Sequence, residues 1–358
     1  MNKFVWLILI LFLLSTQIPA QDIIENPEKP LNSNAGRILK LKEELRITDE
    51  GGEFFFQYPS NVKVAPDGSI FMSDQELLLR FDENGKFIHN FFKKGQGPGE
   101  INYLRDYVFK DGKLIIISSS PVKIMTFLLN GELFDDVTLH ESFTNLRFQF
   151  LNDQRYFFFK NDRPDIGDTP GVVDAPHVLI SMDKYGQNIK EHFSLPYQFF
   201  MTAGAWSGLG RLTSIPYKNK SLFIANTEDY LVKLYDIESH KILRSFRRKY
   251  KRVKPPEDYR WGGLYSRDGK RLGPPPPKYL NDISALYIVN DELWVRTSTR
   301  DEEKGYLIDV FEFDGRFVDS FYLKTDVGRI ISTHGDSIFI RETDENELHT
   351  VVKYTIIE

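Results

Sequence analysis

Short apolar runs separated by turn residues fill the stretch from residue 56 to residue 100. Val62 and Val64 alternate with polar residues before an Asp67-Gly68 pair, and a later pair, Asn84-Gly85, separates two further runs. The runs cover residues 62–64, 70–72, 77–81 and 87–92. Runs of this length bounded by Gly, Asn and Asp predict β-strands joined by tight turns. The stretch therefore predicts one four-stranded antiparallel unit.

The same arrangement recurs along the rest of the chain. Turns between first and second strands are expected at Asp67-Gly68, Asp111-Gly112, Asn152-Asp153, Lys218-Asn219 and Asn290-Asp291. Turns between third and fourth strands are expected at Asn84-Gly85, Asn130-Gly131, Tyr185-Gly186, Ile237-Glu238 and Asp314-Gly315. A last unit begins near Gly328 and has only three strands. The turns predict six repeated units, and a seventh within the insertions is the structural alternative.

The incomplete last unit needs a fourth strand from elsewhere. Residues 37–47 alternate apolar and charged positions, and pairing them with residues 351–357 would close a ring and remove open sheet edges. We therefore expect an all-β fold, a six-bladed β-propeller with four-stranded antiparallel blades, over residues 37–358. Residues 21–36 are expected to be a flexible N-terminal segment, and helices should be few.

Three segments interrupt the repeats. Residues 160–176 are rich in Pro, Gly and Asp and are interpreted as a loop. The two longest gaps between recognisable strands cover residues 196–212 and 247–278, and each contains a Trp beside Gly. Binding residues on rigid scaffolds concentrate in such connections.

The first unit resembles an NHL-type repeat. The resemblance rests on Pro59, Asp67-Gly68, Phe81-Asp82 and the Asn84 to Phe87 stretch, and the GQGPGE segment from Gly95 is similar to the inter-blade linker of secreted bacterial six-bladed propellers. Related propellers include amidating lyases, which hold a metal through His, and lactonases, which use Glu, Asn and Asp. Neither set can be placed residue by residue here, so the resemblance implies a fold more than a chemistry.

The N-terminus predicts export. Lys3 precedes an apolar run of 11 residues, from Phe4 to Leu14, which is shorter than the roughly 20 that a membrane-spanning helix needs. Small and polar residues follow up to Ala20, so residues 1–20 are interpreted as a signal peptide, with an uncleaved anchor as the alternative. The chain contains no Cys, which excludes a Cys-anchored lipoprotein. The expected location is periplasmic or extracellular.

Charge and composition limit the classes of partner that we expect. The net charge of −5 is spread along the chain, which favours solubility and gives no sign of nucleic-acid binding. Aromatic residues make up 14% of the chain, including 29 Phe, as sheets stacked face to face require. We expect a monomer whose partner is a protein, a peptide or a carbohydrate.

No motif specifies a catalytic centre. The seven His are scattered without metal-ligand spacing, and the paired acids lie at expected turns. The EF-hand, phosphate-loop and GxSxG patterns are absent from the sequence. No cofactor is predicted, and calcium or zinc enters only under the alternative of a metal-dependent hydrolase or lyase of the lactonase or amidating-lyase type.

The favoured interpretation is a non-catalytic binding module that recognises its ligand through loops on one face. The first candidates for ligand contact are Trp206, Arg260 and Trp261, in the two long gaps. Further candidates lie at or near the starts of the innermost strands, facing a central channel: Asn61, Arg105, Asp106, Arg147, Asp282 and Arg329. A structural scaffold is a third possibility, which a large apolar face would indicate.

Overall fold

The computed structural model describes residues 23–49, 51–139, 146–161, 171–202, 205–257, 268, 277–324 and 328–357, and for residue 202 and residues 205–209 the backbone alone. The elements assigned in this part of the chain are all β-strands. No described segment forms a helix of the length and apolar character needed to cross a membrane.

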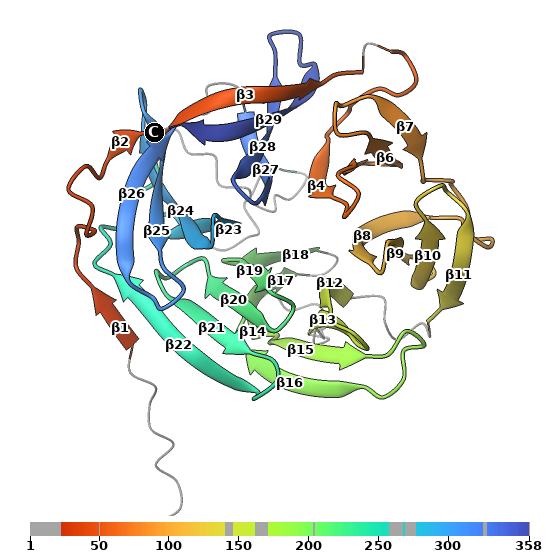
Figure 1. Ribbon diagram of the computed structural model, residues 1–358. Helices are drawn as coiled ribbons and strands as arrows, with labels where there is room; N and C mark the ends of the chain where they lie inside the picture. The colour runs from red at the N-terminus through yellow and green to blue at the C-terminus, as the bar shows by residue number, and fades with distance from the viewer. Residues whose placement is uncertain are drawn as a thin grey trace, which may run out of the picture.

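Six four-stranded units surround a central axis, which confirms the predicted six-bladed propeller (Figure 1). Blade one contains β4 (Ser60–Val64), β5 (Ile70–Asp74), β6 (Leu77–Phe81) and β7 (Phe87–Asn90), and blade two contains β8 (Tyr103–Lys110), β9 (Lys113–Ser119), β10 (Lys123–Leu128) and β11 (Leu133–Thr138). Blade three contains β12 (Leu146–Leu151), β13 (Tyr156–Asn161), β15 (His177–Met182) and β16 (Lys190–Leu195), and blade four contains β19 (Leu212–Tyr217), β20 (Ser221–Asn226), β21 (Val232–Asp236) and β22 (Lys241–Arg248). Blade five contains β23 (Ile283–Val289), β24 (Glu292–Asp301), β25 (Gly305–Phe311) and β26 (Phe317–Leu323), and blade six contains β27 (Gly328–His334), β28 (Ser337–Thr343), β29 (His349–Ile357) and β3 (Lys40–Ile47).

The turns lie where the Gly and Asn pairs predict them. At the first turn, Gly68 has a φ of 85°, and the Asp67 carboxylate accepts a 3.0 Å hydrogen bond from the backbone N–H of Ser69. A positive φ is available to Gly without steric cost, and Asp side chains close such turns by accepting from the backbone. The local sequence therefore determines where each pair of strands reverses direction.

The hydrophobic core lies between neighbouring blades. On β13, Phe158 packs into the cluster shared with blade two, whereas Phe157 and Phe159 pack into the cluster shared with blade four. All three side chains are about 1% exposed. Because a blade is covered on both faces, its middle strands are continuous apolar runs.

The ring closes as predicted. Strand β3 pairs antiparallel with β29, in a register that joins Ile47 to Val351 and Lys40 to Ile357. The expected donor strand is nevertheless divided, because β2 (Arg37–Ile38) pairs with β26 of blade five instead.

The N-terminal segment is more ordered than expected. We call residues 23–47 the N-terminal strap, because they run along the outer edges of blades four, five and six (Figure 1). Strand β1 (Ile23–Asn26) pairs in parallel with β22, and Asn26 donates to the carbonyl oxygens of Gly315 (2.9 Å) and Arg247 (3.1 Å). The prediction of a flexible segment over residues 21–36 is therefore wrong for this strand, whose backbone groups pair with a sheet edge that the repeat pattern does not indicate.

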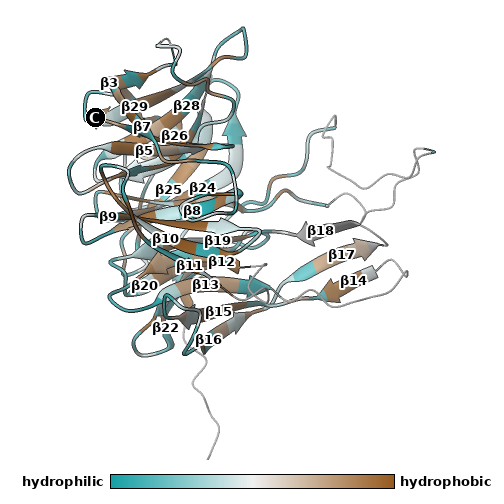
Figure 2. Ribbon diagram, turned by 90° about the vertical axis from the view of Figure 1, so that its right-hand side faces the viewer, coloured by the Kyte–Doolittle hydropathy of each residue, from teal (hydrophilic) through white to brown (hydrophobic). Residues whose placement is uncertain are grey.

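An additional sheet projects from the propeller (Figure 2). It contains β14 (Gly171–Asp174), β17 (Gln198–Thr202) and β18 (Ala205–Leu209), with β17 in the centre. The interpretation of residues 160–176 as a loop is wrong at β14, because this short Gly-Val-Val-Asp segment pairs with a strand more than 20 residues away. Pairing between separate insertions leaves no pattern within either one.

The GQGPGE segment fastens blade one to blade two. The backbone N–H of Gly99 donates to the Asp136 carboxylate at 2.7 Å, and Lys123 donates to the same carboxylate at 2.7 Å and to the carbonyl of Gly97 at 2.8 Å. Lys123 is only 3% exposed. The glycines serve this close packing, so the segment is a structural linker.

Candidate functional site

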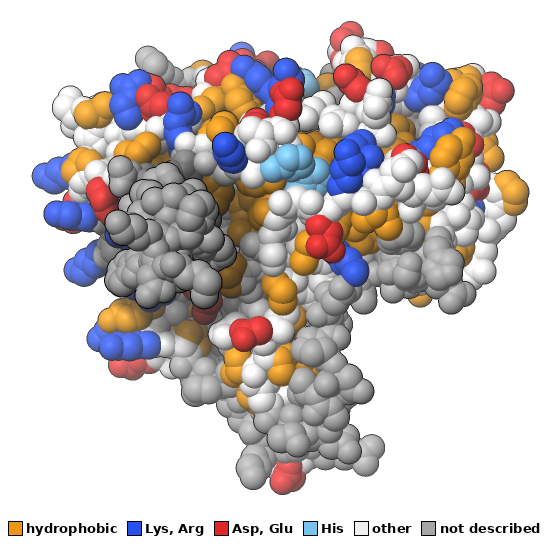
Figure 3. Space-filling view, turned by 90° about the horizontal axis from the view of Figure 1, so that it is seen from below, with side chains coloured by type: hydrophobic (Ala, Val, Ile, Leu, Met, Phe, Trp, Pro, Cys, Tyr) orange, Lys and Arg blue, Asp and Glu red, His pale blue; other side chains and the backbone are white. Residues whose placement is uncertain are grey.

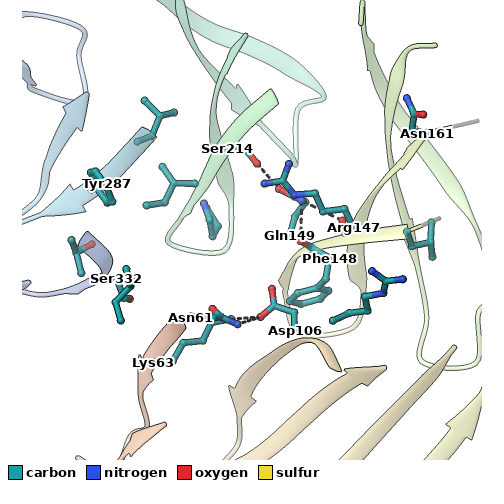
Figure 4. A pocket seen from close by; sticks show the side chains of 17 residues that line it. Asn61, Lys63, Asp106, Arg147, Phe148, Gln149, Asn161, Ser214, Tyr287 and Ser332 are labelled. Atoms are coloured by element: carbon teal, nitrogen blue, oxygen red, sulfur yellow. Dashed lines mark hydrogen bonds and ion pairs between the residues drawn. The ribbon is translucent and has the colours of Figure 1, made fainter. Parts of the chain in front are cut away.

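A cavity of about 850 Å³ lies on the propeller axis, between the innermost strands. Its lining residues come from all six inner strands, and the labelled ones surround an open centre (Figure 4). Four of the sequence candidates meet here: Asn61, Arg105, Asp106 and Arg147. Three basic side chains, Lys63, Arg105 and Arg147, and one acidic side chain, Asp106, line the cavity.

Irregular backbone turns several of these side chains toward the axis. The pairing register shifts between Ser60 and Lys63 on β4 and between Leu104 and Asp106 on β8. Asn61, within the first irregularity, has a φ of 50°. A β-bulge adds a residue to one strand and redirects a side chain, and such features are common beside binding sites. Asn61 and Arg105 lie inside these two bulges and both line the cavity.

The only acid among the lining residues is already paired within the protein. One oxygen of Asp106 accepts hydrogen bonds from the Asn61 amide (2.9 Å), the Lys63 ammonium (2.7 Å) and the backbone N–H of Tyr107 (2.7 Å). Lys63 also donates to the carbonyl of Tyr107. Two of these donors belong to β4, so the Asp106 side chain joins blades one and two.

Two guanidinium groups retain unused donors. The Nε of Arg105 donates to the Ser119 hydroxyl at 2.8 Å, and Nη1 of Arg147 donates to the carbonyl of Leu212 at 3.1 Å. Within the described residues, the other N–H groups of these two side chains have no hydrogen-bond acceptor. Arg147 is open to the channel, but surrounding protein partly desolvates it and lowers its pKa, an effect that nearby Asp106 opposes. Arginine stays charged under these conditions, so both groups present positive charge to the cavity.

The wall formed by blades four, five and six is mainly apolar. Ile215, Pro216, Leu286 and Ile331 contribute hydrocarbon surface, and Tyr287 lies beside them. Ser214 donates to the side-chain oxygen of Gln149 at 2.6 Å, which links blade four to blade three. The cavity is therefore basic on one side and apolar on the other.

A buried polar corner adjoins Arg147 on blade three. The register pairs Arg147 with Phe159 and Asn161 with His177, so all four residues share one face of the sheet. The ring of His177 lies 4.5 Å from that of Tyr197, centroid to centroid. Burial, with a smaller contribution from Arg147, lowers the pKa of His177 to about 4. His177 is therefore neutral near pH 7.

Comparison with known proteins agrees with this architecture. A family model for 6-bladed beta-propeller proteins matches residues 48–246, more than half of the chain. The chain belongs to this propeller family. The propeller is similar to a protein from Bacteroides fragilis inferred to be exported, with a TM-score of 0.58, 13% identity and coverage of 94% of this chain and 100% of that chain.

A second similar structure is a protein from Bacteroides vulgatus. The TM-score is 0.56 at 11% identity, and the match covers 90% of this chain and 99% of that chain. At these identities the likeness establishes the fold alone. No curated protein matches the propeller.

The remaining sequence candidates lie elsewhere. Asp282 precedes β23 and pairs with Arg252 at 2.9 Å, in a separate recess of about 500 Å³ between blades four and five. Arg329, on β27, lines a small recess with Arg296 and Tyr306. The prediction that these two residues face the axial cavity is wrong. Arg329 lies on a strand, which sends alternate side chains to opposite faces, and Asp282 lies before its strand, where it pairs with Arg252.

The candidates in the two long gaps are not located. Trp206 belongs to β18, but its side chain lies outside the described part of the chain, as do Arg260 and Trp261 entirely. Their contact with a ligand stays a prediction. The signal segment, residues 1–20, also lies outside the described residues.

A second recess, of about 660 Å³, lies at the opposite end of the strands on blades two to four. Here the Nδ1 atoms of His192 and His240 are 3.0 Å apart, and Nε2 of His192 is 2.7 Å from the Ser181 hydroxyl. In the view from below, histidine side chains are exposed beside Lys or Arg side chains (Figure 3). The sequence does not reveal the pair, because its members are 48 positions apart on adjacent blades.

Metal binding was expected only under the hydrolase or lyase alternative. Among the described residues, no three His, Cys, Asp or Glu side chains gather closely enough to hold a metal ion. That alternative stays a prediction, and no side-chain arrangement in the described residues favours it.

Proposed function

We propose that the protein is an exported, non-catalytic binding module that holds a small anionic ligand in its axial cavity. The observation that supports this most directly is the pair of guanidinium groups, Arg105 and Arg147, whose spare N–H donors face a cavity in which Asp106 is already neutralised. Guanidinium groups recognise carboxylate and phosphate through parallel hydrogen bonds.

The size of the cavity also supports a small ligand. Its volume of about 850 Å³ falls within the roughly 300–1,000 Å³ of small-molecule sites. The inserted sheet extends the propeller on one side only (Figure 2). The chain passes from β16 to β19 and from β22 to β23, in each case from the last strand of one blade to the innermost strand of the next, so both connections start and finish at the end where inner strands begin. We therefore place the entrance at this end.

The test is ligand-dependent thermal stabilisation. Wild-type protein is screened with acetate, inorganic phosphate, sulfate, D-glucuronate and glucose 6-phosphate, because a ligand that binds only the folded state raises the melting temperature. The double variant Arg105→Gln/Arg147→Gln should lose this response. Lys220→Gln, which removes one positive charge from the opposite recess, is the matched control and should respond as wild type.

Two results would contradict the proposal. One is the absence of stabilisation by any of these anions. The other is an unchanged response in the double arginine variant, combined with its loss in Trp206→Ala/Trp261→Ala, which would move the site to the insertions. Stacked aromatics typically contribute about 1 kcal/mol or more each, so that loss would be measurable.

A further inference from the structure

Asn161 carries a buried hydrogen-bond acceptor that no described residue satisfies. Its side chain is 9% exposed and lines the axial cavity at the end of β13. The Oδ1 atom is buried and has no hydrogen-bond partner. Buried polar atoms without partners are rare in folded proteins and call for an explanation.

The hydrogen bonds of the amide nitrogen fix the orientation of the Asn161 side chain. Nδ2 donates to the carbonyl of Ala175 at 2.6 Å and to that of Pro176 at 3.4 Å. Rotating the amide by half a turn would place an oxygen against two carbonyl oxygens, which is unfavourable. The unpaired atom is therefore the oxygen, and only a donor can satisfy it.

The unpaired acceptor and the unpaired donors of Arg147 belong to neighbouring strands. Arg147 and Asn161 are on adjacent strands of blade three and share one face of the sheet, two positions apart in the register (Figure 4). Diagonal neighbours of this kind are roughly 7–8 Å apart along the sheet, a span that one small molecule can bridge. The same ligand can thus accept from Arg147 and donate to Asn161.

The charge of the cavity indicates which chemical group of the ligand donates the hydrogen bond to Asn161. Three basic side chains against one acid that is already paired disfavour an ammonium group. A hydroxyl group has no such cost and can donate to the Asn161 oxygen once a shift of the side chain exposes that atom to the cavity. The apolar wall of Leu286, Ile215 and Ile331 suits the hydrocarbon face of a ring.

We propose that the cavity binds a sugar bearing an anionic group, with the anion at Arg105 and Arg147 and a hydroxyl donated to Oδ1 of Asn161. This inference rests on the proposed function and specifies its ligand. The anion is a carboxylate, as in a sugar acid, or a phosphate ester, as in a sugar phosphate. Both have the chemistry that the guanidinium groups recognise.

The test is titration calorimetry with a matched series of ligands. D-glucuronate and glucose 6-phosphate carry both features, cyclohexanecarboxylate has the ring and the anion without hydroxyls, and D-glucose and D-glucosamine lack the anion. We expect binding of at least one of the first two, and affinity at least about tenfold weaker for cyclohexanecarboxylate. Glucose and glucosamine should bind more weakly still. Comparison of the first two ligands distinguishes carboxylate from phosphate.

Protein variants complete the test. Arg147→Gln should weaken the preferred ligand at least about tenfold, and Lys220→Gln on the opposite recess should not. Asn161→Ala should abolish the preference for hydroxylated anions, and if this variant does not fold, the ligand series alone decides. Cyclohexanecarboxylate binding as tightly as D-glucuronate and glucose 6-phosphate would overturn this inference while leaving the proposed function intact. Binding of no anion would overturn both.

Discussion

Arg248 and Asp309 form a buried ion pair that joins blades four and five. Asp309 is fully buried and Arg248 is 8% exposed. The guanidinium donates Nε to Oδ2 at 2.7 Å and Nη2 to Oδ1 at 3.1 Å, and the Tyr230 hydroxyl donates to Oδ2 at 2.6 Å. Every oxygen of the carboxylate is thus hydrogen-bonded. Such a pair is costly to break, because the partner is left charged and buried.

We predict that Asp309→Asn lowers the free energy of unfolding by about 3–5 kcal/mol. Urea denaturation at pH 7 measures it. The matched control is Asp314→Asn, which removes an exposed partner of Arg316 and should leave the midpoint unchanged. Equal effects of the two substitutions would show that burial of the pair is unimportant.

His192 should make stability depend on pH. Burial, followed by the neighbouring His240, Arg155 and Lys190, lowers its pKa to about 4 from an ordinary value of 6.5. Between about pH 4 and pH 6.5, His192 therefore binds a proton in the unfolded state but not in the folded state. The stabilisation is complete above about pH 6.5 and is lost as the pH falls toward 4.

We expect His192→Gln to reduce the fall in urea midpoint between pH 7 and pH 4.5. His89→Gln, at an exposed position on blade one, is the control and should behave as wild type. A wild-type pH response in His192→Gln would assign the acid sensitivity to other groups.

At single positions, the sequence predicts which residues are near the axis better than where their side chains point. Asn61, Arg105, Asp106 and Arg147 were identified from their places near the starts of inner strands, and they line the cavity. Asp282 and Arg329 occupy similar places but face other recesses. Asn161 is not among the sequence candidates, because only the fold shows that its Nδ2 donates to the carbonyls of Ala175 and Pro176 while its oxygen has no partner among the described residues.

Among the elements, the N-terminal strap crosses the largest number of blades. After β1 the strap runs beside β26. There the backbone N–H of Asn32 donates to the carbonyl of Val318 at 2.9 Å, and that of Gly36 donates to the carbonyl of Ser320 at 2.7 Å. Asn26 bridges two blades, because it donates to the carbonyl of Arg247 in blade four and to that of Gly315 in blade five, and it accepts from the backbone N–H of Phe317 at 3.0 Å. The strap covers sheet edges that would otherwise be open.

We predict that deleting residues 21–48 lowers the melting temperature markedly, because β29 then loses its outer partner. Asn26→Ala should have a smaller effect, about 1–3 kcal/mol, from the loss of buried hydrogen bonds. Thermal unfolding followed by circular dichroism compares the two. An unchanged melting temperature in the deletion would contradict a closing role for β3.

The blades were predictable because most of their strands follow one another along the chain and are joined by short turns, most of which contain Gly or Asn. The elements that escaped prediction pair over long distances: β1 with β22, β2 with β26, and β14 with β17. The bulges also escaped, because one additional residue in a strand changes the direction of a side chain without changing the apolar pattern.

On the scale of the whole molecule, the sign of charge differs between the surface and the axis. The chain carries a net charge of −5, with acidic and basic side chains interspersed on the side seen in Figure 3. The axial cavity is lined by three basic side chains and one paired acid. The cavity therefore attracts an anion more strongly than the surface of mixed charge does, so fewer anions should bind at the surface.

The N-terminal segment predicts that the whole chain is exported. The short apolar run that ends at Leu14 predicts a mature protein beginning near Gln21, two residues before β1. N-terminal sequencing of protein recovered from the cell envelope or the medium measures this. Detection of Met1 or Asn2 on that protein would support an uncleaved anchor instead.

The pairing of β3 with β29 also governs the order in which the protein can be completed. Residues 40–47 emerge early in synthesis, whereas their partners, residues 351–357, follow about 300 residues later. Contacts between such distant parts of a chain form slowly, because a long loop must be ordered first. A nascent chain can therefore build blades one to five in turn, but β3 has no partner until β29 has been synthesised. Loss of residues 351–357 would leave five finished blades in an unclosed ring.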